Sequence, residues 1–84
     1  MSEEIIPPKL PTLDEAMAAA TPPIRNVLQF FRFAHLPEHL QHRSRIFADL
    51  AVEVACGPQN PETTVALRKL LEAKDAAVRA LFFA

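Results

Sequence analysis

The sequence predicts an all-α fold: an antiparallel αα-hairpin with one or two short N-terminal helices, assembling into a homo-oligomeric helical bundle. Two long segments carry apolar residues at helical spacing, and no segment alternates with a period of two. The "GPQN" linker between them is so short that the two helices must fold back on each other. With 84 residues, half of them hydrophobic, a single core is marginal, so self-association is the favoured way to bury the remaining apolar surface.

The first predicted unit, residues 1–20, is a flexible, proline-rich arm that carries one short helix. Thr12 is the expected N-cap of this helix, and Glu15 three residues later completes a capping box. Pro22 and Pro23 then end the helix, because proline cannot donate the next backbone hydrogen bond.

The second predicted unit, residues 21–84, is the helical hairpin domain. It opens with a short amphipathic helix over Ile24–Phe33, capped by Thr21. The first long helix begins at Pro37 and stops at Gly57, which we expect in the left-handed conformation typical of helix ends. Its expected apolar stripe consists of Leu40, Ser44, Phe47, Ala51 and Val54, flanked by Ile46 and Leu50.

The final helix is predicted to begin after Asn60, which serves as its N-cap, with Pro61 in the first turn. Its expected apolar face consists of Ala66, Leu70, Ala73, Ala77 and Leu81. Phe82 and Phe83 follow, and we expect this aromatic end to lie in an interface between subunits. The alternative is that it folds over the core of its own chain.

The charge balance and the cysteine content limit the classes of function. The chain has 9 Lys and Arg against 10 Asp and Glu, which argues against bulk binding to DNA, RNA or an anionic membrane. Cys56 is the only cysteine, so no internal disulfide can form and a reducing compartment is expected. No signal peptide or membrane-spanning segment is evident, so we expect a soluble, cytoplasmic protein.

Catalysis and metal binding have little support in the sequence, and no cofactor is expected. His35, His39 and His42 have helical spacing, but no further ligand completes a zinc or copper site, so a solvated face is the preferred interpretation. Ser44 lies within an apolar stripe, where its hydroxyl is expected to bond to the preceding turn. Cys56 lies at a helix C-terminus, where the helix dipole opposes the thiolate. We therefore expect no enzyme.

An anion site would have to come from helix N-termini and cationic side chains, since the chain has only one glycine for a phosphate-binding loop. Arg68, Glu72, Asp75 and Arg79 share one ridge of the last helix and predict a ladder of exposed ion pairs.

Two other cations, Arg43 and Lys69, have fewer acidic neighbours and are the better candidates for phosphate. Phe33 and His35, in the turn before the first long helix, offer stacking surfaces for a base.

Two segments, "FRFAHLPEHLQHRSRIFADLA" and "GPQNPETTVALRKLLEAKDAAVRA", resemble the small phage-encoded anti-CBASS cyclic-oligonucleotide sponges, a family built on a helical hairpin. The resemblance covers Phe31–Ala80 and is most specific at "HLPEHLQ" (His35–Gln41) and "LRKLLEAKDAAVRA" (Leu67–Ala80). It does not extend to Met1–Ala20.

This resemblance implies an oligomeric phage antagonist of CBASS immunity that works in the infected host cell. Such a protein binds cyclic dinucleotides, such as cyclic GMP–AMP, without cleaving them, and related sponges also accept cyclic trinucleotides in separate pockets. The family uses a Tyr and a Lys in its dinucleotide site, whereas this chain has no Tyr.

The resemblance assigns residues of this chain to two ligand sites. Phe33 takes the stacking position of the dinucleotide site. The phosphate-binding cation is Arg43 or Arg45 from the first long helix and Lys69 from the second. Arg68 and Arg79 are assigned either to a second, inter-subunit phosphate site or to the ion-pair ladder. The rival interpretation is a helical adaptor or oligomerisation module that binds protein through its alanine and phenylalanine surfaces and has no nucleotide ligand.

Overall fold

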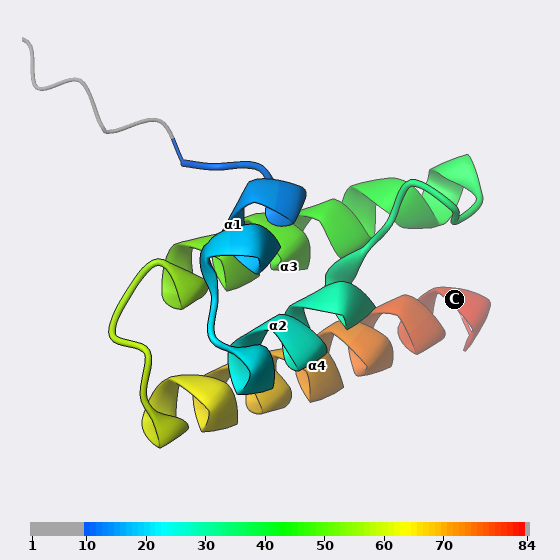
Figure 1. Ribbon diagram of the computed structural model, residues 1–84. Helices are drawn as coiled ribbons and strands as arrows, with labels where there is room; N and C mark the ends of the chain where they lie inside the picture. The colour runs from blue at the N-terminus through cyan, green and yellow to red at the C-terminus, as the bar shows by residue number, and fades with distance from the viewer. Residues whose placement is uncertain (1–9, 84) are drawn as a thin grey trace, which may run out of the picture.

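The computed structural model describes residues 10–83, and over this range the protein is all-helical, without strands (Figure 1). Residues 1–9, the beginning of the predicted arm, and residue 84 lie outside the described range. The elements in chain order are α1 (Leu13–Ala19), α2 (Pro22–Leu28), the 3-10 turn η1 (Gln29–Phe31), α3 (Glu38–Ala55), α4 (Pro61–Ala80) and the 3-10 turn η2 (Leu81–Phe83). None of the helices in this range is long and apolar enough to cross a membrane.

Two of the predicted helix starts are confirmed by their capping hydrogen bonds. The Thr12 hydroxyl accepts from the Glu15 backbone N–H at 3.2 Å, and the Glu15 carboxylate accepts from the Thr12 N–H at 2.9 Å. Hydrogen bonding to Thr12 lowers the pKa of the Glu15 carboxyl. The bond to the Thr12 backbone is the larger cause and the bond to its side chain the smaller one. This part of the cap is therefore present above the ordinary carboxyl pKa and is lost as the pH falls through the lowered value. At α4, Asn60 accepts from the Thr63 N–H at 3.0 Å.

At two other helix ends the predicted position is right but the predicted capping is wrong, and both corrections involve Gln59. Thr21 occupies the N-cap position of α2 without a side-chain cap; instead its backbone N–H donates to Gln59 Oε1 at 3.2 Å. Gly57 does not have a positive φ. No left-handed residue is needed there, because the Gln59 amide donates to the carbonyl oxygens of Ala55 (2.8 Å) and Gly57 (3.1 Å).

The predicted helix over Ile24–Phe33 is corrected at its C-terminal end. It begins at Pro22, directly after the predicted cap Thr21, and its last helical residue is Phe31. Arg32 has an extended backbone, with φ −62° and ψ 137°, which ends the helix and leads the chain across toward Pro37. Phe33 consequently lies in the connection and not on a helix, a position that matters for the candidate site.

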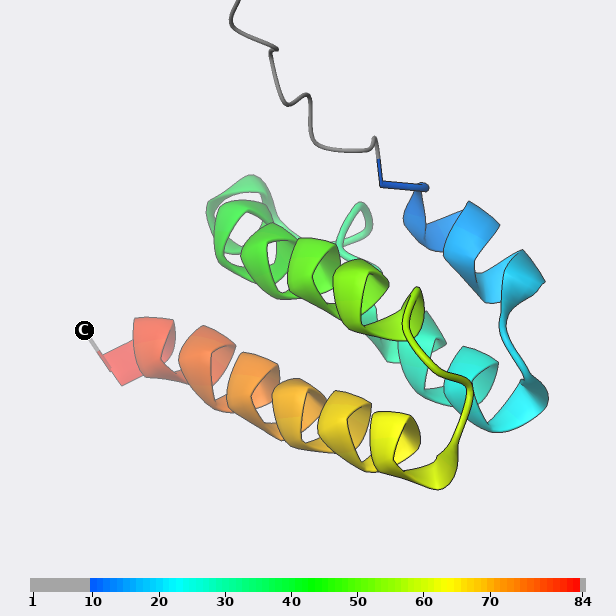
Figure 2. The same cartoon turned by 90° about the vertical axis from the view of Figure 1, so that its left-hand side faces the viewer.

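The four α-helices surround one hydrophobic core. α3 packs against α4, α2 lies against both of them, and α1 rests on α2 and α3 (Figures 1 and 2). The core includes buried residues from every α-helix, α1 included, and from η1: Ala16, Ala20, Ile24, Val27, Leu28, Phe31, Ala48, Ala51, Val52, Ala55 and Leu67. Residues 13–19 thus belong to the same packed unit as the later helices.

The predicted apolar faces of the long helices are only partly the buried ones. On α3, Leu40 and Ala51 are buried as predicted, but Ile46 and Leu50 are exposed. On α4, Leu67 is fully buried, whereas Ala66 and Ala73 of the predicted face are exposed. The buried face of α4 is rotated toward Leu67 because α4 covers α2 as well as α3.

Arg25 holds α1 onto α2 through the carbonyl groups at the end of α1. Its Nε donates to the Met17 carbonyl at 2.9 Å, and a terminal nitrogen donates to the Ala20 carbonyl at 2.8 Å. A guanidinium at a helix C-terminus satisfies unpaired carbonyls and interacts favourably with the helix dipole. A helix of seven residues has little stability of its own, so this clamp matters for α1.

We therefore expect Arg25→Met to increase amide hydrogen exchange in α1 while leaving exchange in α3 and α4 nearly unchanged. Hydrogen-exchange mass spectrometry measures both quantities in one experiment. The matched control is Arg43→Met on the exposed surface of α3, which should leave α1 unaffected. Equal protection of α1 in both variants would show that packing alone holds this helix.

Candidate ligand-binding cleft

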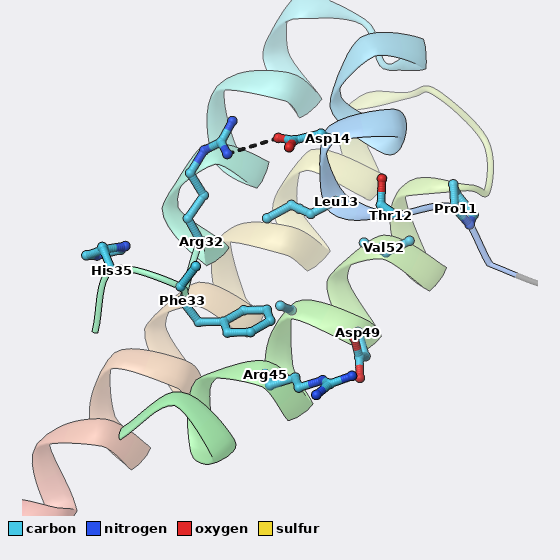
Figure 3. A pocket seen from close by; sticks show the side chains of 12 residues that line it. Pro11, Thr12, Leu13, Asp14, Arg32, Phe33, His35, Arg45, Asp49 and Val52 are labelled. Atoms are coloured by element: carbon cyan, nitrogen blue, oxygen red, sulfur yellow. Dashed lines mark ion pairs between the residues drawn. The ribbon is translucent and has the colours of Figure 1, made fainter. Parts of the chain in front are cut away.

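A cleft of about 490 Å³ lies between the start of α1, the connection after η1, and α3 (Figure 3). This volume is within the range of roughly 300–1,000 Å³ found for small-molecule sites. Its lining residues are Pro11, Thr12, Leu13, Asp14, Arg32, Phe33, Ala34, His35, Arg45, Ala48, Asp49 and Val52. Three of the seven predicted site residues, Phe33, His35 and Arg45, meet here.

One wall of the cleft is an irregular segment held in place by Gln41. The Gln41 amide donates to the Leu36 carbonyl at 2.8 Å and, more weakly, to the Ala34 carbonyl at 3.4 Å. The Leu36 N–H also donates to the Phe33 carbonyl at 3.0 Å. These bonds satisfy backbone groups that no helix or strand satisfies, and they fix the position of Phe33 beside α3.

The interior of the cleft is apolar. Ala48 and Val52 of α3 are buried beneath it, and Phe33 is half-buried and packs against the core. In Figure 3 the Phe33 ring and the Leu13 side chain point inward, whereas the His35 ring points away from them at the outer edge. The cleft can therefore offer Phe33 to a planar ring, and His35 is placed for contact with only the outer part of a ligand.

The rim of the cleft carries balanced charges. Arg32 forms an ion pair with Asp14 of α1, with 2.9 Å between the guanidinium nitrogen and the carboxylate oxygen. Arg45 and Asp49 lie one helical turn apart on α3. The formal charges of these two arginines and two aspartates sum to zero. The cleft therefore attracts a phosphate only where a guanidinium is released from its neighbouring carboxylate.

The remaining predicted site residues lie elsewhere. Arg68 borders two other clefts on α4, one of about 430 Å³ with Phe30 and Leu71 and one of about 550 Å³ with Val65, and neither shares a lining residue with the candidate cleft. Arg43, Lys69 and Arg79 are exposed on α3 and α4 and line none of these three clefts.

The predicted ion-pair ladder on α4 is wrong, and Lys69, predicted to have few acidic neighbours, pairs with the one acid near it. Glu72 pairs with Lys69 at 3.8 Å, not with Arg68. Asp75 pairs at 2.8 Å with the adjacent Lys74, whose side chain is largely buried, and not with Arg79. Among residues 10–83, Arg43 has no ion-pair partner, as predicted.

Sequence reasoning missed Arg32 and Asp14, the ion pair across the cleft. They are separated by 18 positions, and no local spacing rule connects them. The available signal was the "FRF" triplet, in which Arg32 stands between two aromatic residues.

The structure also shows where the candidate nucleophiles and the potential metal ligands lie. Ser44 is buried as predicted, but its hydroxyl has no hydrogen-bond partner within the described part of the chain, so the expected bond to the preceding turn is absent. Cys56 is exposed as a free thiol at the end of α3. Across residues 10–83, no three His, Cys, Asp or Glu side chains come together in a group that could hold a metal.

Comparisons with known proteins add no family to this description. No protein-family model matches the chain, and searches of curated proteins and of solved structures likewise found no match. The function must therefore be argued from the cleft and its residues.

Proposed function

We propose that this protein binds and sequesters cyclic dinucleotide second messengers without cleaving them, as a phage antagonist of CBASS immunity in the cytoplasm of the infected cell. The observation that carries this proposal is the meeting of Phe33, His35 and Arg45 at one cleft, together with the second guanidinium of Arg32. Aromatic and cationic side chains around an apolar floor are the groups that a ligand with stacking bases and phosphates requires.

Each residue has a definite role in this proposal. Phe33 stacks against one base, which rests on the apolar surface of Ala48 and Val52. Arg45 donates hydrogen bonds to a phosphate from the α3 side, and Arg32 approaches from the opposite side. His35 contacts the outer part of the ligand. No nucleophile or base is assigned, so the bound ligand is released unchanged.

The proposal also includes an assembly. We propose that α3 and α4 form an antiparallel hairpin and that copies of the chain associate through the apolar surfaces the core leaves uncovered. Those surfaces include Ile46 and Leu50 on α3 and Phe82 and Phe83 at the end of the chain, with Phe83 87% exposed. Exposed aromatic residues of this kind are typical of protein interfaces.

The test is calorimetric titration with cyclic GMP–AMP, followed by heat release and chromatography of the ligand. We expect binding with intact ligand recovered, and we expect Arg45→Ala to weaken binding by about ten- to a hundredfold, since it removes a charged hydrogen bond to phosphate. Arg43→Ala is the matched control, because Arg43 lies two residues away on α3 but outside the cleft. Equal losses in both variants would mean that general charge, and not the cleft, attracts the ligand.

The second candidate function is a helical adaptor or oligomerisation module, favoured by the same exposed apolar residues on α3 and after α4. In that case cyclic GMP–AMP produces no heat and no thermal stabilisation, whereas a protein partner is retained through Phe82 and Phe83. Sedimentation analysis of the wild-type chain and of the Phe82→Ser/Phe83→Ser variant then separates self-association from ligand binding.

A further inference from the structure

The two terminal nitrogens of Arg32 are both directed at α1. One forms the 2.9 Å ion pair with Asp14, and the other lies 3.6 Å from the sulfur of Met17. Arg32 is thus folded back along α1 at the edge of the cleft. In this position its guanidinium cannot give a bidentate pair of hydrogen bonds to a phosphate in the cleft.

The ion pair is also easy to break. The Arg32 side chain is 50% exposed and the Asp14 side chain 75% exposed, so water and salt weaken their attraction. α1 does not depend on it alone, because Arg25 holds the other end of the helix through two carbonyl groups. A competing anion can therefore take Arg32 from Asp14 without releasing α1 from the fold.

We propose that Asp14 is an intramolecular competitor for Arg32, and that a phosphate of the ligand binds by displacing this carboxylate. This inference rests on the proposed function for the identity of the ligand, but its physical content applies to any phosphate-bearing ligand of the cleft. Removing the carboxylate frees the guanidinium and changes the charge of the rim from zero to +1. Asp14 thus sets the affinity of the site for phosphate without itself binding the ligand.

Asp14→Asn is the direct test, because the amide keeps the size of the side chain and removes its charge. Loss of an exposed ion pair of this kind changes an equilibrium constant by up to about fivefold. We therefore expect Asp14→Asn to lower the Kd for the ligand by up to this factor. The control is Glu53→Gln on α3, which changes the net charge equally at an exposed position outside the cleft. The probes are cyclic GMP–AMP and inorganic pyrophosphate, and amide exchange in α1 checks that the helix remains folded.

A double-mutant cycle with Arg32→Met separates competition from general electrostatics. If Asp14 acts by occupying Arg32, Asp14→Asn improves binding in the wild-type chain and has no effect when Arg32 is methionine. An equal improvement in both backgrounds means that Asp14 merely repels the anion, which overturns the inference.

The two probes distinguish this inference from the proposed function. Tightening for pyrophosphate alone, without binding of cyclic GMP–AMP, supports the competition while rejecting the proposed ligand. Binding of cyclic GMP–AMP that Asp14→Asn leaves unchanged or weakens supports the ligand while overturning the competition. Absence of binding of both probes to every variant overturns both.

Discussion

Replacing Phe31 with alanine is expected to lower the free energy of unfolding by about 3–5 kcal/mol, the usual cost of truncating a buried phenylalanine. Phe31 is 1% exposed and is among the largest fully buried side chains of the protein. It ends the turn η1 within the same core as α2 and α3, so the cavity would open where these elements meet. Since a domain of this size has only about 4–13 kcal/mol of stability, much of the fold's stability would be lost.

The measurement is urea unfolding followed by circular dichroism, and the neighbouring Phe30→Ala is the control. Phe30 is 58% exposed, so its truncation removes little buried surface and should cost less than about 1 kcal/mol. Similar midpoints for the two variants would contradict the burial described here. A larger loss in Phe30→Ala would instead indicate that Phe30 is buried in solution, in an interface between copies of the chain.

Replacing Ser44 with alanine is expected to raise the free energy of unfolding by about 1–3 kcal/mol. Ser44 is 2% exposed in the middle of α3, and its hydroxyl oxygen has no hydrogen-bond partner among residues 10–83. Burying an unpaired hydroxyl costs about this amount, and alanine removes the group without leaving a large cavity. Alanine also has the higher helix propensity of the two residues.

Thr63 provides the comparison, because it is also buried but its hydroxyl is bonded. Its Oγ1 donates to the Pro58 carbonyl at 2.6 Å and lies 3.2 Å from Asn60 Oδ1. Thr63→Val keeps the shape and removes those bonds, so it should destabilise where Ser44→Ala stabilises. Thermal unfolding of both variants shows whether each substitution raises or lowers the free energy of unfolding. Destabilisation by Ser44→Ala would show that the hydroxyl finds a partner that the structure does not contain.

Helix positions were predictable from local features of the sequence. The capping box at Thr12 and the cap at Asn60 depend on side chains three residues from the groups they satisfy, so periodicity and capping rules suffice. The end of α2 and the buried face of α4 were not predictable in this way. The helix after Thr21 ends because Arg32 adopts an extended backbone, and the buried face of α4 depends on how α2 packs against it; helix periodicity cannot say which of two adjacent faces a third helix will cover.

The candidate site shows the same division. Phe33 was predictable as a stacking surface from its residue type and its place in the turn before the first long helix, whereas Arg45 was assigned only through the family resemblance; both line the candidate cleft. Arg32 and Asp14 were not predictable because their pairing depends on how α1 lies across α3, and the sequence predicts residues 1–20 to be a flexible arm with a short helix, apart from the hairpin domain. The pairing of Lys69 was predicted only in part: Glu72 is the acid near it, but the i,i+4 spacing favours Arg68 as the partner of Glu72, whereas in the structure Glu72 takes the i,i+3 pairing with Lys69.

The side chain of Gln59 makes the length of the α3–α4 loop part of the fold. Loops between helices normally accept inserted residues at small entropic cost. Here one amide group reaches the carbonyl of Ala55 at the end of α3, the carbonyl of Gly57 in the loop, and the backbone N–H of Thr21, 38 residues away along the chain. An insertion before Gln59 would draw that amide away from the start of α2, so this loop acts as a spacer of fixed length. Substitutions at the exposed residues of this loop are therefore tolerated better than insertions or deletions that change its length.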